Sequence, residues 1–204
     1  MKKIGHYIRK EYDKFKKKKW YGKLLDLLFV VLLVLLLIPS TRKGVMTYAS
    51  KVRMYLTPVE EKEEKVSITR TESLQFADAG GNRYALDQYL DKPVFINYWA
   101  TWCPPCRAEM PGLEKLYRQY GDKINFLFIS NQKMSKQQEF IQKNGYELPV
   151  YQLLSRPGGT FQYSALPTSL IISKDNKVVM RKEGAVNWQS KKIRAIFDRV
   201  AGAN

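Results

Sequence analysis

The sequence predicts an α/β domain preceded by a single membrane-spanning helix. Two observations support this prediction. Between residues 67 and 204, apolar strand-like runs alternate with amphipathic helical segments, and a run of leucine and valine comes before this domain. We therefore divide the chain into a basic segment (1–23), a membrane anchor (24–39), a juxtamembrane helix with a charged linker (40–66) and the α/β domain (67–204).

The N-terminal part has the pattern of a membrane anchor. Ten of the first 23 residues are Lys or Arg, and the apolar run Leu24–Ile38 ends at Pro39. Counted from Trp20, the apolar span would form roughly 28 Å of helix, which is close to the thickness of a hydrocarbon core. No clear small-residue cleavage site follows the run, so we interpret it as an uncleaved anchor and not as a signal peptide.

The basic residues before the span also predict its orientation. Their excess places the N-terminus in the cytoplasm. The α/β domain would then lie in the periplasm or an equivalent extracytoplasmic space, held at the cytoplasmic (inner) membrane by a single-pass anchor, where disulfides persist. The chain has a formal net charge of +16. Because the Lys and Arg of the domain are scattered, we expect no nucleic-acid partner.

Residues 40–66 are the predicted connector. Apolar residues at helical spacing between Val45 and Leu56 indicate a short helix, either on the membrane surface or loosely packed beside it, which Thr57-Pro58 ends. The mixed charge run 60–65 is typical of a solvated linker.

The first half of the domain is organised around one buried strand. A hairpin is expected to join strands at 74–77 and 83–86, with a short turn at 87–89 after it. The apolar run at 94–100 suits a strand buried on both faces. A helix should follow Cys103.

The second half alternates strands and helices before it ends in a hairpin and a helix. The expected elements are a strand at 124–129, a helix at 135–143, a short strand at 148–153, an antiparallel pair at 168–173 and 177–181, and a helix at 188–200. The Gly-rich stretch 156–164 is assigned to no element.

Both cysteines of the chain lie in the motif Cys103-Pro104-Pro105-Cys106. Pro104 fits the first turn of a helix, so Cys103 falls about at the N-cap, where it faces unpaired N–H groups and the positive end of the helix dipole. This position favours the thiolate, which is the nucleophilic form. Cys103 and Cys106 are therefore a candidate redox-active dithiol/disulfide couple that needs no bound cofactor.

Other uses of this motif fit the composition poorly. A structural zinc site usually needs four Cys or His ligands, but the one histidine is His6, on the other side of the expected membrane span. Haem attachment requires a His directly after the second Cys, where this chain has Arg107. A static disulfide across so short a loop would remove little entropy from the unfolded chain.

The motif and its surroundings resemble one family. Trp102 and the two cysteines, the preceding run Phe-Ile-Asn-Tyr-Trp-Ala-Thr, Pro111 and Leu166-Pro167-Thr168 are similar to thioredoxin-fold proteins, in particular to the membrane-anchored TlpA/ResA/CcmG-like thiol–disulfide oxidoreductases. The resemblance covers residues 68–204. It implies a thioredoxin-like fold with a four- or five-stranded mixed sheet, helices on both faces and a hairpin ahead of the central strand.

The resemblance also implies roles for individual residues. Cys103 would be the exposed nucleophile and Cys106 the buried resolving thiol. Pro167 would be a cis-proline that faces the cysteines and presents the backbone of Leu166, although an edge-strand start is an alternative for this proline. The residues expected to bind a substrate polypeptide are Trp102, Pro104, Leu166 and Pro167. Trp102 would also shield the couple, with simple packing as its alternative role.

Glu109 is the candidate acid–base group. It lies one helical turn after Cys106 on the same face, and its i+4 neighbour is Leu113, not a cation. A carboxylate there would be partly buried with a raised pKa, suited to moving a proton at the Cys106 sulfur. ResA-like proteins have a functional Glu at the matching position. Many thioredoxins have an Asp six residues before the first Cys, where this chain has Asn97. An ordinary solvated Glu is the alternative.

These features predict a membrane-anchored extracytoplasmic thiol–disulfide oxidoreductase. The resemblance implies reduction of protein disulfides, such as keeping apocytochrome c cysteines reduced, with electrons from a membrane donor protein. Two alternatives stay open. One is a disulfide-forming oxidase on the same fold, and the other is a membrane-tethered module that binds a metal or a partner through the dithiol.

Overall fold

The structure is a computed structural model that describes residues 20–37, 39–56 and 74–202. The chain divides into two compact units, residues 1–45 and 46–204. Most of the predicted basic segment, the charged linker and the first residues of the predicted domain lie outside the described residues.

Two helices precede the domain. They are α2 (Trp20–Leu37) and α3 (Pro39–Leu56). Pro39, which was expected to end the anchor, begins α3, because proline is tolerated in the first turn of a helix. α3 ends directly before the predicted Thr57-Pro58 stop. Of the helices that the structure describes, none combines the length and the apolar character that crossing a bilayer demands.

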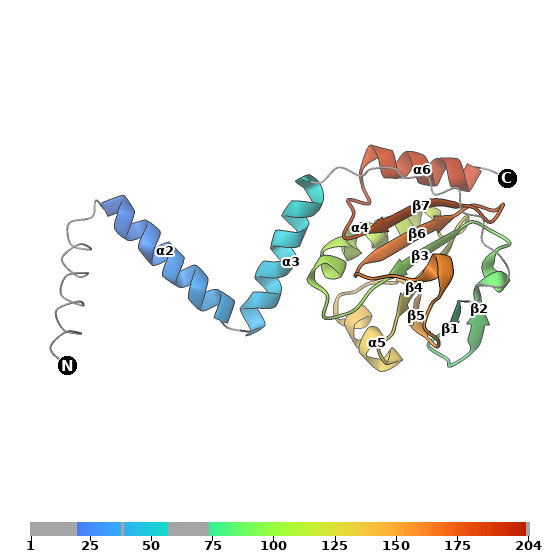
Figure 1. The fold of residues 1–204 in the computed structure, drawn as a ribbon, viewed down its shortest axis with the longest axis horizontal. Coiled ribbons are helices and arrows are strands. Elements are labelled where there is room, and N and C mark those ends of the chain that lie inside the picture. The colour runs from blue at the N-terminus through green and yellow to red at the C-terminus, as the bar shows by residue number, and fades with distance from the viewer. Residues whose placement is uncertain (1–19, 38, 57–73, 203–204) are drawn as a thin grey trace. The chain divides into compact units, whose positions relative to one another are not determined.

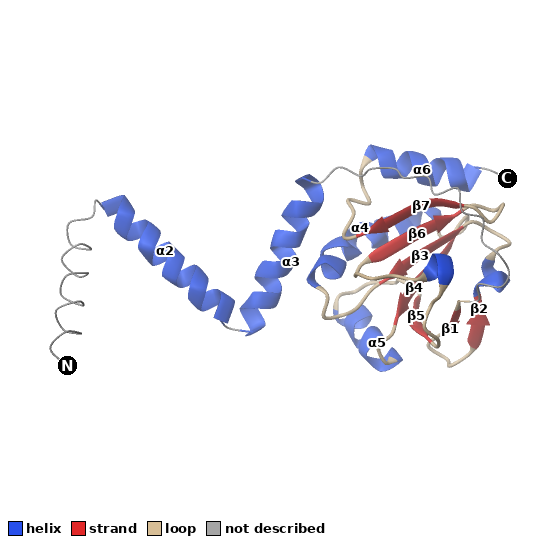
Figure 2. Cartoon of the chain, viewed as in Figure 1, coloured by secondary structure: helices blue, strands red, loops and turns tan. Residues whose placement is uncertain are grey.

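The domain contains one seven-stranded mixed sheet in the order β2-β1-β5-β4-β3-β6-β7 (Figures 1 and 2). The strands are β1 (Gln75–Ala77), β2 (Arg83–Ala85), β3 (Val94–Tyr98), β4 (Asn125–Ser130), β5 (Val150–Leu153), β6 (Thr168–Ile172) and β7 (Val178–Glu183). β4 pairs in parallel with β3 and β5, and the other neighbours are antiparallel. The predicted α/β architecture is confirmed. The sheet exceeds the expected four or five strands because the N-terminal hairpin joins it through β1 and β5.

Three helices cover one face of this sheet. Buried side chains of α4 (Pro104–Tyr120), α5 (Met134–Lys143) and α6 (Lys191–Gly202) share a core with alternate strand residues such as Phe95 and Phe128. The opposite core, around Ile96 and Leu127, takes no buried side chain from these helices. The expectation of helices on both faces is therefore wrong for the described part of the domain. The crossovers β3–α4–β4 and β4–α5–β5 step in the same direction across the sheet, so right-handed connections place both helices on one face.

Short turns close the second face. The 3-10 helices η1 (Leu86–Tyr89) and η2 (Gly159–Phe161) bury Leu86 and Phe161 in the core around Ile96. η2 lies in the Gly-rich stretch for which the sequence predicted no element. The ring of Tyr163, just after η2, stacks on Tyr98 at the end of β3 with centroids 4.3 Å apart.

The other predicted elements are present with shifted ends, and one shift matters for the site. The last helix was predicted at 188–200, but α6 begins at Lys191, and Trp188 lies fully buried in the turn before it. β7, this turn and α6 therefore deliver Trp188 to the core that α4 faces.

Candidate functional site

The cysteine motif lies where β3 passes into α4. Cys103 is the N-cap of α4, with extended backbone angles, and Pro104 stands in the first turn. The Cys106 N–H donates a hydrogen bond to the Cys103 sulfur at 3.2 Å. Cys103 and Cys106 form a disulfide with their Cα atoms 5.3 Å apart. The predicted N-cap position is confirmed. In the reduced protein, a thiolate at Cys103 would therefore be stabilised by the N–H groups at the start of α4 and by the helix dipole.

Neither sulfur-bearing residue is exposed in this oxidised state. Cys103 is 2% exposed and Cys106 is fully buried, whereas Trp102 is 61% exposed. The expectation that Cys103 is the exposed cysteine is therefore wrong for the disulfide form, because the bond to Cys106 holds its sulfur against the helix end. Trp102 stands out from the domain instead of packing in it, and Pro104 is half-buried.

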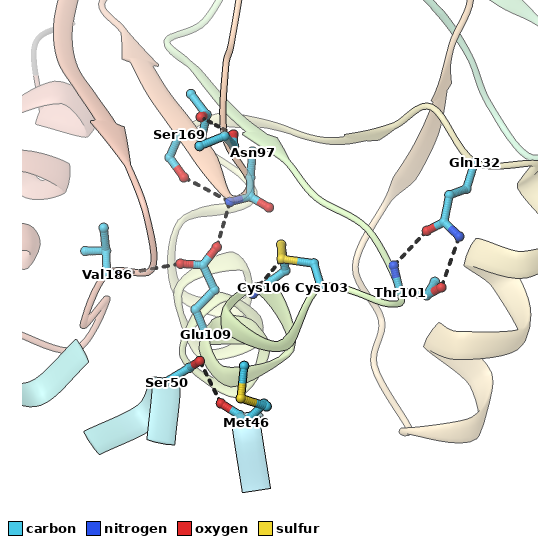
Figure 3. The surroundings of a disulfide bond; sticks show 12 residues. Met46, Ser50, Asn97, Thr101, Cys103, Cys106, Glu109, Gln132, Ser169 and Val186 are labelled. Atoms are coloured by element: carbon cyan, nitrogen blue, oxygen red, sulfur yellow. Dashed lines mark hydrogen bonds between the residues drawn. A yellow bond between two sulfur atoms is a disulfide. The ribbon is translucent and has the colours of Figure 1, made fainter. Parts of the chain in front are cut away.

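The Glu109 carboxylate is buried and held by three donors, of which Figure 3 shows Asn97 and Val186. Oε1 accepts a hydrogen bond from the Asn97 side chain at 2.9 Å. Oε2 accepts from the Val186 backbone N–H and from the Trp188 indole N–H, each at 3.1 Å. Glu109 follows Cys106 by three residues, so the two side chains share a face of α4. The expected burial of Glu109 is confirmed, and it is more complete than expected.

Burial controls the protonation of Glu109. Loss of water raises its pKa from the usual 4.5 to about 7, while the hydrogen bonds from Asn97, Val186 and Trp188 act in the opposite direction. A carboxyl group that titrates near neutral pH both takes up and releases a proton under ordinary conditions. The raised pKa expected from the sequence is confirmed.

Asn97 connects Glu109 to the neighbouring strand. It lies opposite Ser169 in the β3–β6 pair, and its side-chain N–H group donates to Ser169 Oγ at 2.9 Å as well as to Glu109. Its carbonyl oxygen Oδ1 is buried and has no hydrogen-bond partner among the described residues. An amide at this position stabilises the ionised form of Glu109, which a second carboxylate would oppose.

A cis peptide bond joins Leu166 to Pro167, as the resemblance implied. β6 begins at the next residue and pairs with Tyr98 at the end of β3, so Pro167 lies at the sheet end that carries the cysteine motif. The Pro167 carbonyl accepts a hydrogen bond from Gly184 N–H at 2.8 Å. Gly184 has a φ of +88°, a conformation that glycine adopts without strain.

Comparisons with known proteins agree with this geometry. The Redoxin family model matches residues 63–196. The chain belongs to the Redoxin family. It is 31% identical over 129 residues to the thiol-disulfide oxidoreductase ResA of Bacillus thuringiensis subsp. konkukian, a match that covers 60% of this chain and 73% of ResA. It is 35% identical over 99 residues to the thioredoxin-like protein YneN of Bacillus subtilis, covering 46% of this chain and 58% of YneN.

The fold has solved counterparts. The crystal structure of a Chlorobium tepidum protein assigned as a thiol:disulfide interchange protein DsbE superimposes with a TM-score of 0.54 at 17% identity, covering 71% of this chain and all of that one. Within the Redoxin family the chain is thus a thioredoxin-fold, TlpA/ResA-like thiol–disulfide oxidoreductase.

The sequence did not reveal two of the three donors that hold Glu109. Val186 and Trp188 lie 77 and 79 positions after Glu109, and nothing local to them indicates an acidic partner. The one available signal was chemical, because a buried indole N–H usually finds an acceptor. Assigning Trp188 to the last helix hid that signal.

The site also contains a polar clamp before the cysteines. Gln132, just after β4, accepts a hydrogen bond from the Thr101 backbone N–H and donates to Thr101 Oγ1 (Figure 3). This clamp holds the loop ahead of Trp102 against the end of β4. Among the described residues, no group of three or more His, Cys, Asp or Glu side chains is placed to hold a metal ion.

Proposed function

We propose that this protein is a membrane-anchored, extracytoplasmic reductase of protein disulfides. The observation that carries the proposal is the placement of two groups at the start of α4. The Cys103 sulfur caps the helix and accepts the Cys106 N–H, and the buried Glu109 carboxyl follows one turn later. The first group favours a nucleophilic sulfur, and the second serves as a proton store.

In the first step, the Cys103 thiolate of the reduced protein attacks one sulfur of a substrate disulfide. The substrate S–S bond breaks, a mixed disulfide forms through Cys103, and one substrate thiolate leaves. The helix N-terminus stabilises the attacking thiolate through its N–H groups.

In the second step, Cys106 resolves the mixed disulfide. Ionised Glu109 takes the proton of the Cys106 thiol, and the new thiolate attacks the Cys103 sulfur. The Cys103–Cys106 disulfide forms and the second substrate sulfur leaves as a thiolate. Two electrons have passed from the dithiol to the substrate, so the two sulfurs supply the redox chemistry without a bound cofactor.

The substrate polypeptide would bind at the sheet end around the cysteines. Exposed Trp102, half-buried Pro104 and half-buried Leu166 offer side chains there, and the cis-bonded Pro167 shapes the backbone of Leu166. The ResA resemblance supports a protein substrate, and we propose apocytochrome c cysteines as one such substrate.

The remaining parts of the proposal concern the membrane. The run Leu24–Ile38 and the exposed apolar side chains along α2 support an anchor, and the basic residues before it support a cytoplasmic N-terminus. A membrane electron donor protein would return the couple to the dithiol state. Protease treatment of intact spheroplasts tests this arrangement, since it should remove the domain and spare the N-terminal segment.

Trapping of partners tests the reaction itself. The full-length Cys106→Ser variant should accumulate mixed disulfides through Cys103 in membranes, and these should disappear on reduction. The Cys103→Ser variant is the matched control and should trap nothing. Equal recovery of partners from both variants, or from neither, would contradict the exchange mechanism.

The reduction potential of the Cys103–Cys106 couple decides whether the protein reduces or forms disulfides in its substrates. Titration of the full-length chain against glutathione or dithiothreitol should give a value of roughly −270 mV or lower, in the range of thioredoxin. A value near roughly −120 mV would make the protein an oxidant of the DsbA kind and reverse the proposed direction.

A further inference from the structure

A cationic hollow is lined in part by residues that flank the cysteine motif. We call it the α4–α5 hollow; its volume is about 320 Å³, and it is lined by Thr101, Arg107, Lys136, Glu139, Phe140, Lys143 and Asn144. Thr101 lies two residues before Cys103, and Arg107 directly follows Cys106. The hollow therefore adjoins both ends of the reactive motif.

Its positive charges are arranged on fixed elements. Lys136, Phe140 and Lys143 follow one another at i, i+4 and i+7, so they share one face of α5. The Arg107 guanidinium carbon lies 5.7 Å from the centroid of the Phe140 ring, which holds this cation of α4 over the same surface. Besides α5 and α4, the loop at Thr101 lines the hollow, and the hydrogen bonds with Gln132 hold this loop in place.

Few acidic side chains neutralise these cations. Glu139 is the one acidic residue of the lining. Among the described residues, none of Arg107, Lys136 and Lys143 forms a salt bridge, and the nearby Glu114 is already paired with Arg118. Three cations against one carboxylate give a positive potential next to the sulfur that a partner must reach.

We infer that the α4–α5 hollow docks an acidic segment of the partner polypeptide, next to the cysteine that exchanges with Cys103. This inference rests on the proposed function and adds the charge of its partners. The hollow is open and its lysines are exposed, so it suits carboxylate side chains of a polypeptide passing over the surface. Complementary charge at such a rim acts mainly on the association rate.

Three model substrates test the docking. They are disulfide peptides of equal length that flank the same cysteine pair with Glu, Gln or Lys, and their reduction by the pre-reduced full-length chain is followed under single-turnover conditions. At about 0.01 M salt, the Glu peptide should react roughly tenfold faster than the Gln peptide, and the Lys peptide should be slowest. At about 1 M salt, where the screening length is about 3 Å, the three rates should converge.

Matched charge reversals locate the effect. Lys136→Glu/Lys143→Glu should abolish the advantage of the Glu peptide and make the Lys peptide the fastest. Lys123→Glu/Lys174→Glu changes the net charge by the same amount at exposed positions of the opposite sheet end, near the start of β4 and the end of β6, and should keep the original order. If both double variants shift the rates equally, overall charge explains them and the hollow is not a docking site.

A binding measurement separates this inference from the proposed reaction. A fluorescent Glu peptide with serines in place of its cysteines should bind the oxidised full-length chain, and Lys136→Glu/Lys143→Glu should weaken that binding roughly tenfold. Loss of peptide reduction with binding intact would overturn the reductase function and leave the docking surface. Equal rates for all three peptides with no binding would overturn the docking surface and leave the reductase.

Discussion

The indole N–H of Trp188 donates a hydrogen bond to Oε2 of Glu109 across 79 residues of sequence. Both side chains are buried, and the indole of Trp188 packs edge-on against Phe95 with ring centroids 5.1 Å apart. Trp188 thus stabilises the ionised form of the carboxyl group expected to accept the Cys106 proton. The first prediction follows from this contact.

Trp188→Phe should raise the pKa of Glu109 by about one unit. The substitution keeps an aromatic ring but removes a donor to the carboxylate, a bond of about 1.5–3 kcal/mol when the acceptor is charged. Carbon-13 NMR of labelled Glu side chains measures the titration. Trp99→Phe is the matched control, since the Trp99 indole N–H has no hydrogen-bond partner among the described residues. An unchanged Glu109 titration in Trp188→Phe would contradict the role of this bond.

Glu109 should make the protein less stable as the pH rises. Its pKa lies at about 7 in the folded protein against 4.5 ordinarily, so between these values the folded state binds more protons than the unfolded state. The stabilisation is complete below pH 4.5 and is lost as the pH rises through 7, a change of roughly 3 kcal/mol in the free energy of unfolding. Urea unfolding of the oxidised chain at several pH values measures it.

The control for this pH dependence is Glu109→Gln. It keeps the shape of the side chain and removes the titration, so the free energy of unfolding should become nearly flat over the same range. A wild-type profile that matches that of Glu109→Gln would show that Glu109 does not titrate there.

Asn97→Asp should destabilise the domain above neutral pH by about 3 kcal/mol. The change places a second carboxylate within hydrogen-bond distance of Glu109, and two buried carboxylates that close resist simultaneous ionisation. At pH 5 the loss should shrink, because the pair then shares a proton. Asn131→Asp, at an exposed position just after β4, is the control for the added charge. Denaturation midpoints at both pH values measure the loss. A loss of the same size at pH 5 and above neutral pH would contradict the repulsion between the two carboxylates.

Gly184→Ala should cost about 1 kcal/mol of stability. The φ of +88° at this residue is unfavourable for any residue with a Cβ, although open space surrounds the position. Gly158→Ala, which is equally unobstructed and has a φ of −113°, should leave the melting temperature nearly unchanged. Equal melting temperatures for the two variants would show that the Gly184 turn relaxes without cost.

The sequence predicts those parts of the site that depend on residues only a few positions apart. Pro104 two positions before Cys106 signals the helix start, and the i, i+3 spacing puts Glu109 on the face of Cys106. Local patterns also suffice for the strand order along the chain, because each strand has its own apolar run.

The parts that the sequence leaves undetermined depend on tertiary contacts. The donors of Glu109 from Val186 and Trp188 come together only when β7 and its turn fold back on α4. The amphipathic period of Ile193, Ile196 and Val200 extended too far back, so Trp188 was read as helical although its turn backbone ends that period. The seven-stranded sheet required the pairing of β1 with β5, and separate strand signals contain no information on such a partner.

The hydrogen bond from Gly184 to Pro167 has a mechanical consequence. It joins the segment on which a polypeptide would rest to the segment that presents Val186 and Trp188 to Glu109. The chain from Pro167 through β6 and β7 to Gly184 is closed into a ring by this hydrogen bond. A polypeptide bound at the Leu166 backbone would therefore rest on a segment that is hydrogen-bonded to Gly184, two residues before Val186, a donor to Glu109.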